Sequence, residues 1–344
     1  MTEMQEIQKR FEWIDPLRVL AAFGVMLAHI AAKDWHNLDV TGAAWQICNF
    51  YDGLGCSSVH CFVMISGAIF LSRPLDLKKL YSKNLLRIAT AFSCWSLYYA
   101  YFGISQSKPV IERIIAGATH LWYCYAIAGV YILMPLLKRI SEDSRLTDYY
   151  LKIAFVFKFL LTTFALLLGL FDCTKAVSNG IRTAAGYFYT GTGALFALAF
   201  YFMLGYRLAH TDFPKKTRRL IYLAGIIGVF STIFLTSYAS VSAGKPIASF
   251  YGGFTLNTLF VATALFVFAK YNLKSGKFIR KLSDCTFGAY LVHAAFDIWF
   301  QRMGIVTDRC PLLLIPAIAL AVFVCSFAAS ALLNRIPYVK KYIV

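Results

Sequence analysis

The chain has 344 residues, of which 59% are hydrophobic and only 15% are charged. About a quarter of the residues in a typical soluble domain are charged, so this composition excludes an ordinary soluble domain and favours a membrane protein. The formal net charge of +17 alone would suit a nucleic-acid partner, but most basic residues lie in short loops between apolar segments, so we expect no nucleic acid.

Apolar segments long enough to cross a lipid bilayer as α-helices recur along the whole chain. The predicted spans are 14–32, 47–71, 85–103, 120–137, 150–171, 187–209, 220–238, 250–269, 287–303 and 311–333. No long linker or loop large enough for a soluble domain separates them. We predict an all-α, polytopic transmembrane helical bundle of about ten helices, with residues 1–344 forming a single integral membrane domain.

The distribution of Lys and Arg predicts the topology, because short cytoplasmic loops hold more of these residues than loops on the other side. With both termini placed in the cytoplasm, the N-terminal segment and the cytoplasmic loops hold 23 of the 34 basic residues, and the opposite side holds 8. The other three, Arg18, Lys152 and Lys158, lie inside predicted spans. The sequence therefore predicts that both termini are cytoplasmic.

The first span carries two polar residues, Arg18 and His29, inside an apolar helix. Eleven residues correspond to about three helical turns and roughly 16 Å of rise, so both side chains project from one face at different depths. Such groups usually face the bundle interior or an aqueous cavity and are functional candidates. The structural alternative is a snorkelling arginine and a hydrogen-bonded histidine.

The second span is unusually small and polar, with Asp52, His60, Ser66 and Gly67 among its aromatic residues. Small residues allow helices to pack closely, so packing explains Ser66 and Gly67 as well as function does. Asp52, near the predicted outer end, is the stronger candidate. His60 has no partner that the sequence identifies.

Two further histidines lie in predicted spans, His120 at the outer end of the fourth and His293 near the middle of the ninth. The nine cysteines include no C-x-x-C pair. The sequence thus predicts neither a disulfide framework nor a metal site.

Short motifs in a fixed order make the chain resemble the acyltransferase family 3 membrane proteins. They are Arg18-x10-His29, 62–67 (FVMISG), a basic segment that ends at Arg87, 120–123 (HLWY) followed by Pro135, Gly205-Tyr206, and 287–293 (FGAYLVH). The similarity extends over nearly the whole chain. It is greatest to the small members that O-acetylate bacterial surface glycans, such as enterobacterial common antigen.

The resemblance implies an acetyl-CoA donor, a hydroxyl of a glycan or lipid-linked saccharide as acceptor, and a place in the bacterial inner membrane. The chain departs from the family pattern where many members carry R-x-x-R, since it reads Asn84-Leu85-Leu86-Arg87. A role in holding the donor therefore transfers to Arg87. Lys83 is a candidate substitute for the missing arginine, although its ammonium lacks the planar fork of Arg.

A thioester is already activated, so the enzyme must position the acceptor hydroxyl, remove its proton and stabilise the oxyanion. We predict that His29 is the general base and that Arg18, Asp52 and His120 complete the catalytic group. Arg18 and Arg87, with Lys83, are expected to hold the anionic donor, and Ser66 and His293 to contact it. Ser66 as an acyl-carrying nucleophile is less suitable, because no G-x-S-x-G elbow surrounds it.

Two other classes remain open from the sequence. A secondary transporter or a flippase for a lipid-linked glycan would share the composition, but it predicts two related halves with interrupted helices, which the sequence lacks. A non-catalytic membrane sensor or scaffold would tolerate replacement of the histidines.

Overall fold

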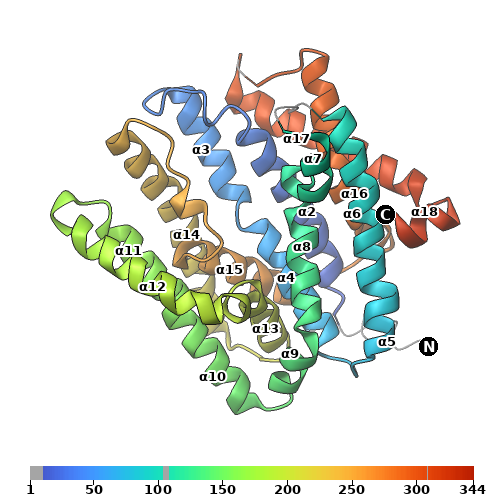
Figure 1. The fold of residues 1–344 in the computed structure, drawn as a ribbon, viewed down its shortest axis with the longest axis horizontal. Helices are drawn as coiled ribbons and strands as arrows, with labels where there is room; N and C mark the ends of the chain where they lie inside the picture. The colour runs from blue at the N-terminus through green and yellow to red at the C-terminus, as the bar shows by residue number, and fades with distance from the viewer. Residues whose placement is uncertain (1–10, 104–107, 308) are drawn as a thin grey trace.

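The computed structural model describes residues 11–103, 108–307 and 309–344. These residues form helices, with no β-strand among them, and the helices cover all ten predicted spans (Figure 1). Seven helical segments of this described part are long and apolar enough to cross a membrane, at Ile14–Ala31, Ala43–Phe70, Val110–Ile132, Ser144–Leu168, Lys215–Ala243, Ser249–Asn272 and Pro311–Leu333. The prediction of an all-α polytopic bundle is confirmed.

The first half of the bundle runs from α2 to α11. In chain order it contains α2 (Ile14–Ala31), α3 (Ala43–Gly55), α4 (Ser58–Phe70), α5 (Leu77–Lys79), the π-helix η1 (Leu80–Leu85), α6 (Leu86–Phe102), α7 (Val110–Ala116), the 3-10 turn η2 (Thr119–Leu121), α8 (Trp122–Ile132), α9 (Met134–Ser141), α10 (Ser144–Ala154), the π-helix η3 (Phe155–Leu160) and α11 (Leu161–Leu168).

The second half begins with the short turn η4 (Asp172–Thr174). It continues with α12 (Lys175–Phe196), α13 (Leu198–Ala209), α14 (Lys215–Ala243), the turn η5 (Ser249–Tyr251), α15 (Leu256–Asn272), α16 (Lys277–Arg302), α17 (Pro311–Leu333) and α18 (Pro337–Tyr342).

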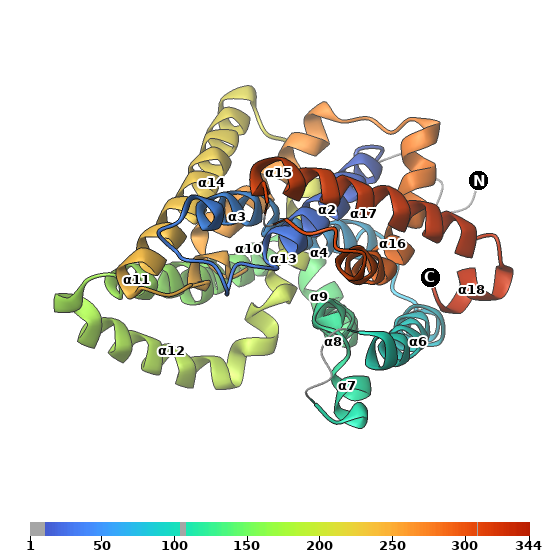
Figure 2. The same ribbon diagram turned by 90° about the horizontal axis from the view of Figure 1, so that it is seen from above.

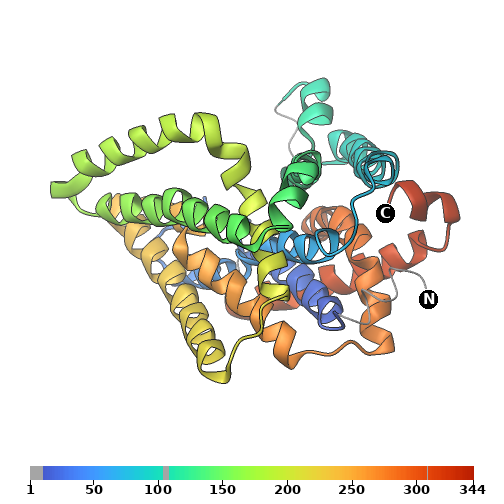
Figure 3. The ribbon, with the colours of Figure 1, turned by 90° about the horizontal axis from the view of Figure 1, so that it is seen from below.

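The span predicted as one helix at 187–209 is two helices, so that prediction was wrong. The backbone leaves the helical region at Ala197, where ψ is −122°, between α12 and α13. Figures 2 and 3 show α12 at the periphery and α13 turned into the bundle. The apolar residues of α13 continue the hydrophobic run, so hydropathy alone conceals the break. The span at 47–71 is likewise divided, at Cys56 and Ser57, into α3 and α4.

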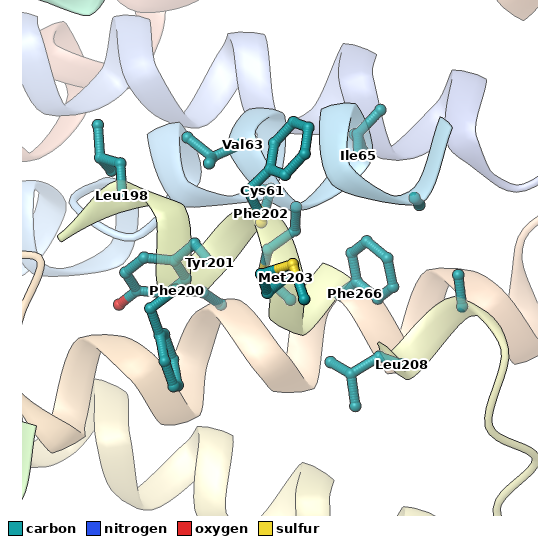
Figure 4. Packing of buried hydrophobic residues seen from close by; sticks show 14 of the residues in the cluster. Cys61, Val63, Ile65, Leu198, Phe200, Tyr201, Phe202, Met203, Leu208 and Phe266 are labelled. Carbon is teal, nitrogen blue, oxygen red and sulfur yellow. The ribbon is translucent and has the colours of Figure 1, made fainter. Parts of the chain in front are cut away.

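The centre of the bundle is the contact between α4 and α13. A Cβ atom on Gly67 would lie 1.7 Å from the carbonyl oxygen of Phe202, and one on Gly205 would lie 2.0 Å from that of Met64. These glycines let the two backbones touch, and buried residues such as Val63, Phe202 and Met203 fill the space around them (Figure 4). Close approach through small residues is typical of membrane helices.

Another glycine contact places α2 inside the bundle. A Cβ atom on Gly55 of α3 would lie 2.3 Å from the carbonyl oxygen of Gly24 and 2.8 Å from the Cβ atom of Ala28. Helix α2 therefore packs tightly against α3, and it also contacts α4, α16 and α17. Arg18 and His29 lie on this central helix.

Candidate active site

We call the end of the bundle predicted to face the cytoplasm the inner end, and the opposite one the outer end. Helices α2 and α16 run parallel between them, since contacts advance together along both sequences. Asp15 lies 3.9 Å from the Arg280 guanidinium at the inner end, and an ion pair joins Lys33 to Asp297 at the outer end. The candidate site lies along these two helices.

Three histidines meet near the outer end. His29 from α2 and His120 from η2 both pack against His293 of α16, with ring centroids 5.1 Å and 4.9 Å apart. His293 is 2% exposed, His120 is 5% exposed and His29 is half-buried. The structure thus brings together three of the residues singled out in the sequence, and we call them the histidine cluster.

The orientation of His293 follows from one hydrogen bond. Its Nδ1 atom lies 2.6 Å from the carbonyl oxygen of Tyr290, which can only accept, so Nδ1 donates. In a neutral ring the lone pair is therefore on Nε2. The Nε2 atoms of His293 and His120 are both buried without a hydrogen-bond partner, so two imidazole nitrogens are available to a bound hydroxyl.

The rings meet edge to face. In the described part of the chain, no set of three His, Cys, Asp or Glu side chains is arranged to hold a metal ion. Imidazole groups in such an arrangement can transfer protons and can donate or accept hydrogen bonds.

Two tyrosines that the sequence reasoning missed fix the histidine cluster in place. The Tyr290 hydroxyl donates to the carbonyl of His120 at 2.5 Å. The Tyr99 ring packs on His120 at 4.8 Å, and its hydroxyl donates to the carbonyl of Leu291 at 2.8 Å. Tyr290 could have been found from its place three residues before His293, whereas nothing in the sequence marks Tyr99.

Toward the inner end, three arginines lie in the neighbourhood of one tyrosine. Arg18, Arg73 and Arg87 all lie within electrostatic range of the Tyr131 hydroxyl. We call this group the arginine site. The sequence identified Arg18 and Arg87 as donor ligands, whereas the structure adds Arg73 and Tyr131. Guanidinium groups that lie around one point are suited to the several oxygens of a phosphate group.

Tyr123 connects the arginine site with the histidine cluster. Its ring lies 5.8 Å from that of Tyr290, and its hydroxyl lies near Ser66 and Arg18. Ser66 donates to the carbonyl of Phe62 at 2.9 Å, and its hydroxyl lies near those of Tyr123 and Tyr131. Polar side chains of α4 and α8 therefore lie beside α2 between Arg18 and His29.

Arg87 makes a second set of contacts. It donates to the carbonyl oxygen of Val344 from Nε at 3.2 Å and from Nη2 at 2.6 Å, and its guanidinium lies 5.1 Å from the centre of the Phe287 ring. Lys83 is exposed on η1 and is not among the cations that act on Tyr131. The structure therefore brings Arg87 to the site and leaves Lys83 outside it.

Asp52 lies elsewhere. It acts electrostatically on Tyr251 and Cys56. No hydrogen bond or ion pair between Asp52 and His29 occurs among the described residues, so the structure does not bring the predicted carboxylate to the histidine cluster.

A largely apolar groove of about 630 Å³ lies on the other side of α8, between α4, α13 and residues 251–254. We call it the lateral groove. Trp122, Gly129 and Leu133 line it, while Tyr123 and Tyr131 of the same helix face the site. A Cβ atom on Gly129 would meet nothing within 4 Å. Helix α8 thus separates the polar site from an apolar space within the membrane.

A family model described as an acyltransferase domain matches residues 11–335, which is nearly the whole chain. No curated protein and no solved structure matches it. The matched region includes the histidine cluster and the arginine site.

Proposed function

Because the chain belongs to the acyltransferase 3 family and is a multi-pass membrane protein, it is a membrane acyltransferase, and we propose that it moves an acetyl group from cytoplasmic acetyl-CoA to a glycan hydroxyl. The observation that carries this proposal is the placement of three arginines and three histidines at different depths along α2. Cations at one end suit an anionic donor, and imidazoles at the other suit removal of a proton.

The arginine site supports binding of the donor by its phosphates. Arg18, Arg73 and Arg87 provide planar, permanently charged donors that pair with phosphate oxygens in a bidentate manner. In the predicted topology the site lies near the cytoplasmic face, where CoA is found. The pantetheine arm would then extend past Tyr123 toward the histidine cluster.

The reaction itself needs one base and a place for the oxyanion. In this proposal His29 takes the proton of the acceptor hydroxyl as its oxygen attacks the thioester carbonyl carbon. The tetrahedral intermediate collapses, the carbon–sulfur bond breaks, and the CoA thiolate takes the proton from His29. His120 and His293 orient the acceptor or the base through their unpartnered Nε2 atoms.

The acceptor is proposed to be a cell-surface or lipid-linked saccharide, as for the small surface-glycan O-acetyltransferases. The lateral groove supports a lipid-linked form, since it lies among membrane spans and is lined mainly by apolar side chains. It offers a place for the hydrocarbon chain while the sugar reaches the outer end. In this proposal the enzyme lies in the bacterial inner membrane, as the resemblance to the surface-glycan O-acetyltransferases implies.

Two measurements test the proposal. Purified protein should release labelled acetyl from acetyl-CoA, to water or to an acceptor. Mass analysis of surface glycans from cells with and without the protein should show the loss of one acetyl mass. A flippase or other transporter would release no acetyl from acetyl-CoA, and its loss would not remove an acetyl mass from the glycans. Loss of a different acyl mass would mean that the donor carries that acyl group.

A further inference from the structure

We propose that the ion pair between Lys33 and Asp297 closes the outer end of the histidine cluster and holds His29 against His293. The two charged residues are positioning residues and do not touch the reacting atoms. The consequence for turnover rests on the proposed function, whereas the structural consequence does not.

The spacing of the charged residues from the histidines in the sequence matches the contacts in the structure. Lys33 follows His29 by four residues and Asp297 follows His293 by four residues, so the ion pair lies about one helical turn further out than the imidazole pair. The same two chain segments therefore provide both pairs. The groups lie in the same order on each segment, and a shift of one helix along the other would separate both pairs at once.

A second set of contacts joins the same two chain segments at the inner end. Asp15 accepts a hydrogen bond from Ser275 at 2.9 Å and lies 3.9 Å from the Arg280 guanidinium. The two contacts lie near opposite ends of α2, whose 18 residues make it about 27 Å long. With α2 and α16 fixed near both ends, His29 and His293 cannot slide relative to each other.

The ion pair is largely desolvated, since the side chains of Lys33 and Asp297 are only 16% and 18% exposed. Removing one partner of such a pair leaves a charge that the surroundings cannot solvate. Asp34, which accepts a hydrogen bond from Thr307 at 2.9 Å, adds a negative charge close to Asp297. Without Lys33 the two carboxylates would repel each other, so the outer end would open.

The variants to compare are Asp297→Asn and Lys33→Met, which each remove one charge, and the double exchange K33D/D297K, which restores an ion pair in the opposite sense. Asp297→Glu is the conservative variant. Asp148→Asn is the matched control, because it removes an ion pair between α10 and α13 with Arg207, away from the histidine cluster.

Diethyl pyrocarbonate, which modifies accessible neutral imidazoles, gives a readout that does not depend on activity. Peptide mass analysis of the full-length protein in nanodiscs reports the modification rate of each histidine. We expect His120 and His293 to react at least about tenfold faster in the two single-charge variants. The double exchange and Asp297→Glu should slow the modification of His120 and His293 again. Asp148→Asn should leave their modification at the wild-type rate.

Kinetics then test the positioning role. In the single-charge variants kcat for release of acetyl from acetyl-CoA should fall by about tenfold or more, while KM for acetyl-CoA stays within about twofold, because alignment is lost and donor binding is kept. Wild-type modification rates in both single-charge variants would overturn the inference. A wild-type protein that turns over no acetyl-CoA would overturn the proposed function, and the modification pattern would still decide whether the ion pair closes the cluster.

Discussion

The imidazole of His29 is the group on which the proposed chemistry depends. We expect His29→Ala to lower acetyl transfer by at least about a hundredfold, because removal of the acceptor proton is lost, and to leave the dissociation constant for acetyl-CoA nearly unchanged. Transfer is measured with labelled acetyl-CoA and binding by titration. His36→Ala, in the exposed loop after α2, is the control and should retain activity. Full activity of His29→Ala would remove the assignment of the base.

The three arginines of the arginine site should act on donor binding instead. We expect Arg18→Gln, Arg73→Gln and Arg87→Gln each to raise KM for acetyl-CoA by about tenfold or more, since each removes charge-assisted hydrogen bonds to phosphate. Arg139→Gln, which breaks an exposed ion pair with Glu142, is the matched control. Unchanged donor affinity in all three arginine variants would contradict the role of the site.

The sequence alone was enough to single out candidate site residues where a charged or titratable side chain lies inside an apolar helix, as with Arg18, His29 and His293. The same reasoning could not find Arg73 or Tyr131, because an arginine in a basic loop and a tyrosine in an aromatic span look ordinary in the sequence. Asp52 was also singled out by its position in a span, which did not reveal that its neighbours are Tyr251 and Cys56. In all of these cases the neighbouring residues lie on helices that are distant in the sequence, so the sequence alone does not show the contact.

Contact between the backbones of α4 and α13 gives a prediction about stability. A methyl group on Gly67 would overlap the carbonyl oxygen of Phe202, which belongs to the backbone and cannot move aside. We expect Gly67→Ala to destabilise the fold by about 1–3 kcal/mol and to lower the unfolding temperature in detergent. Gly180→Ala, at an exposed position of α12 with open space around it, should leave that temperature the same or raise it slightly.

The apolar wall of α8 gives a second prediction. Gly129→Trp should fill the lateral groove without a backbone clash, because open space lies beside Gly129. We expect transfer to a lipid-linked acceptor to fall several-fold, while release of acetyl from acetyl-CoA to water continues at the wild-type rate. Gly180→Trp, outside the groove, is the control. Equal transfer to the lipid-linked acceptor by both variants would show that the groove does not hold its chain.

Hydropathy predicted the positions of the long apolar helices, of which seven are long and apolar enough to cross a membrane in the described part of the chain, because a bilayer demands a long apolar run wherever the backbone spans it. It could not predict the interruptions at Ala197 and at Cys56–Ser57, since the residues on both sides of each break are apolar or small. The π-helices η1 and η3 were also unpredictable, because they change hydrogen bonding and leave hydropathy the same.

The predicted topology of the whole molecule rests on the distribution of basic residues, and two exposed cysteines test it. Cys173 and Cys310 lie in loops predicted to be on the outer side. A membrane-impermeant maleimide should label both in intact spheroplasts and neither in inverted vesicles. Replacing each with serine in turn assigns the signal. Labelling in inverted vesicles alone would reverse the predicted orientation.

The parallel pairing of α2 with α16 joins segments that are made at very different times. Lys33 and Asp297 are separated by 264 positions. At a synthesis rate of about 5–20 residues per second, the ribosome needs roughly 15–50 s to add the second segment after the first. During that interval Arg18 and His29 are without their neighbours on α16, Asp284 and His293. Under the proposed function, a nascent or prematurely terminated chain therefore lacks His293 and carries an incomplete catalyst, which should not consume thioester.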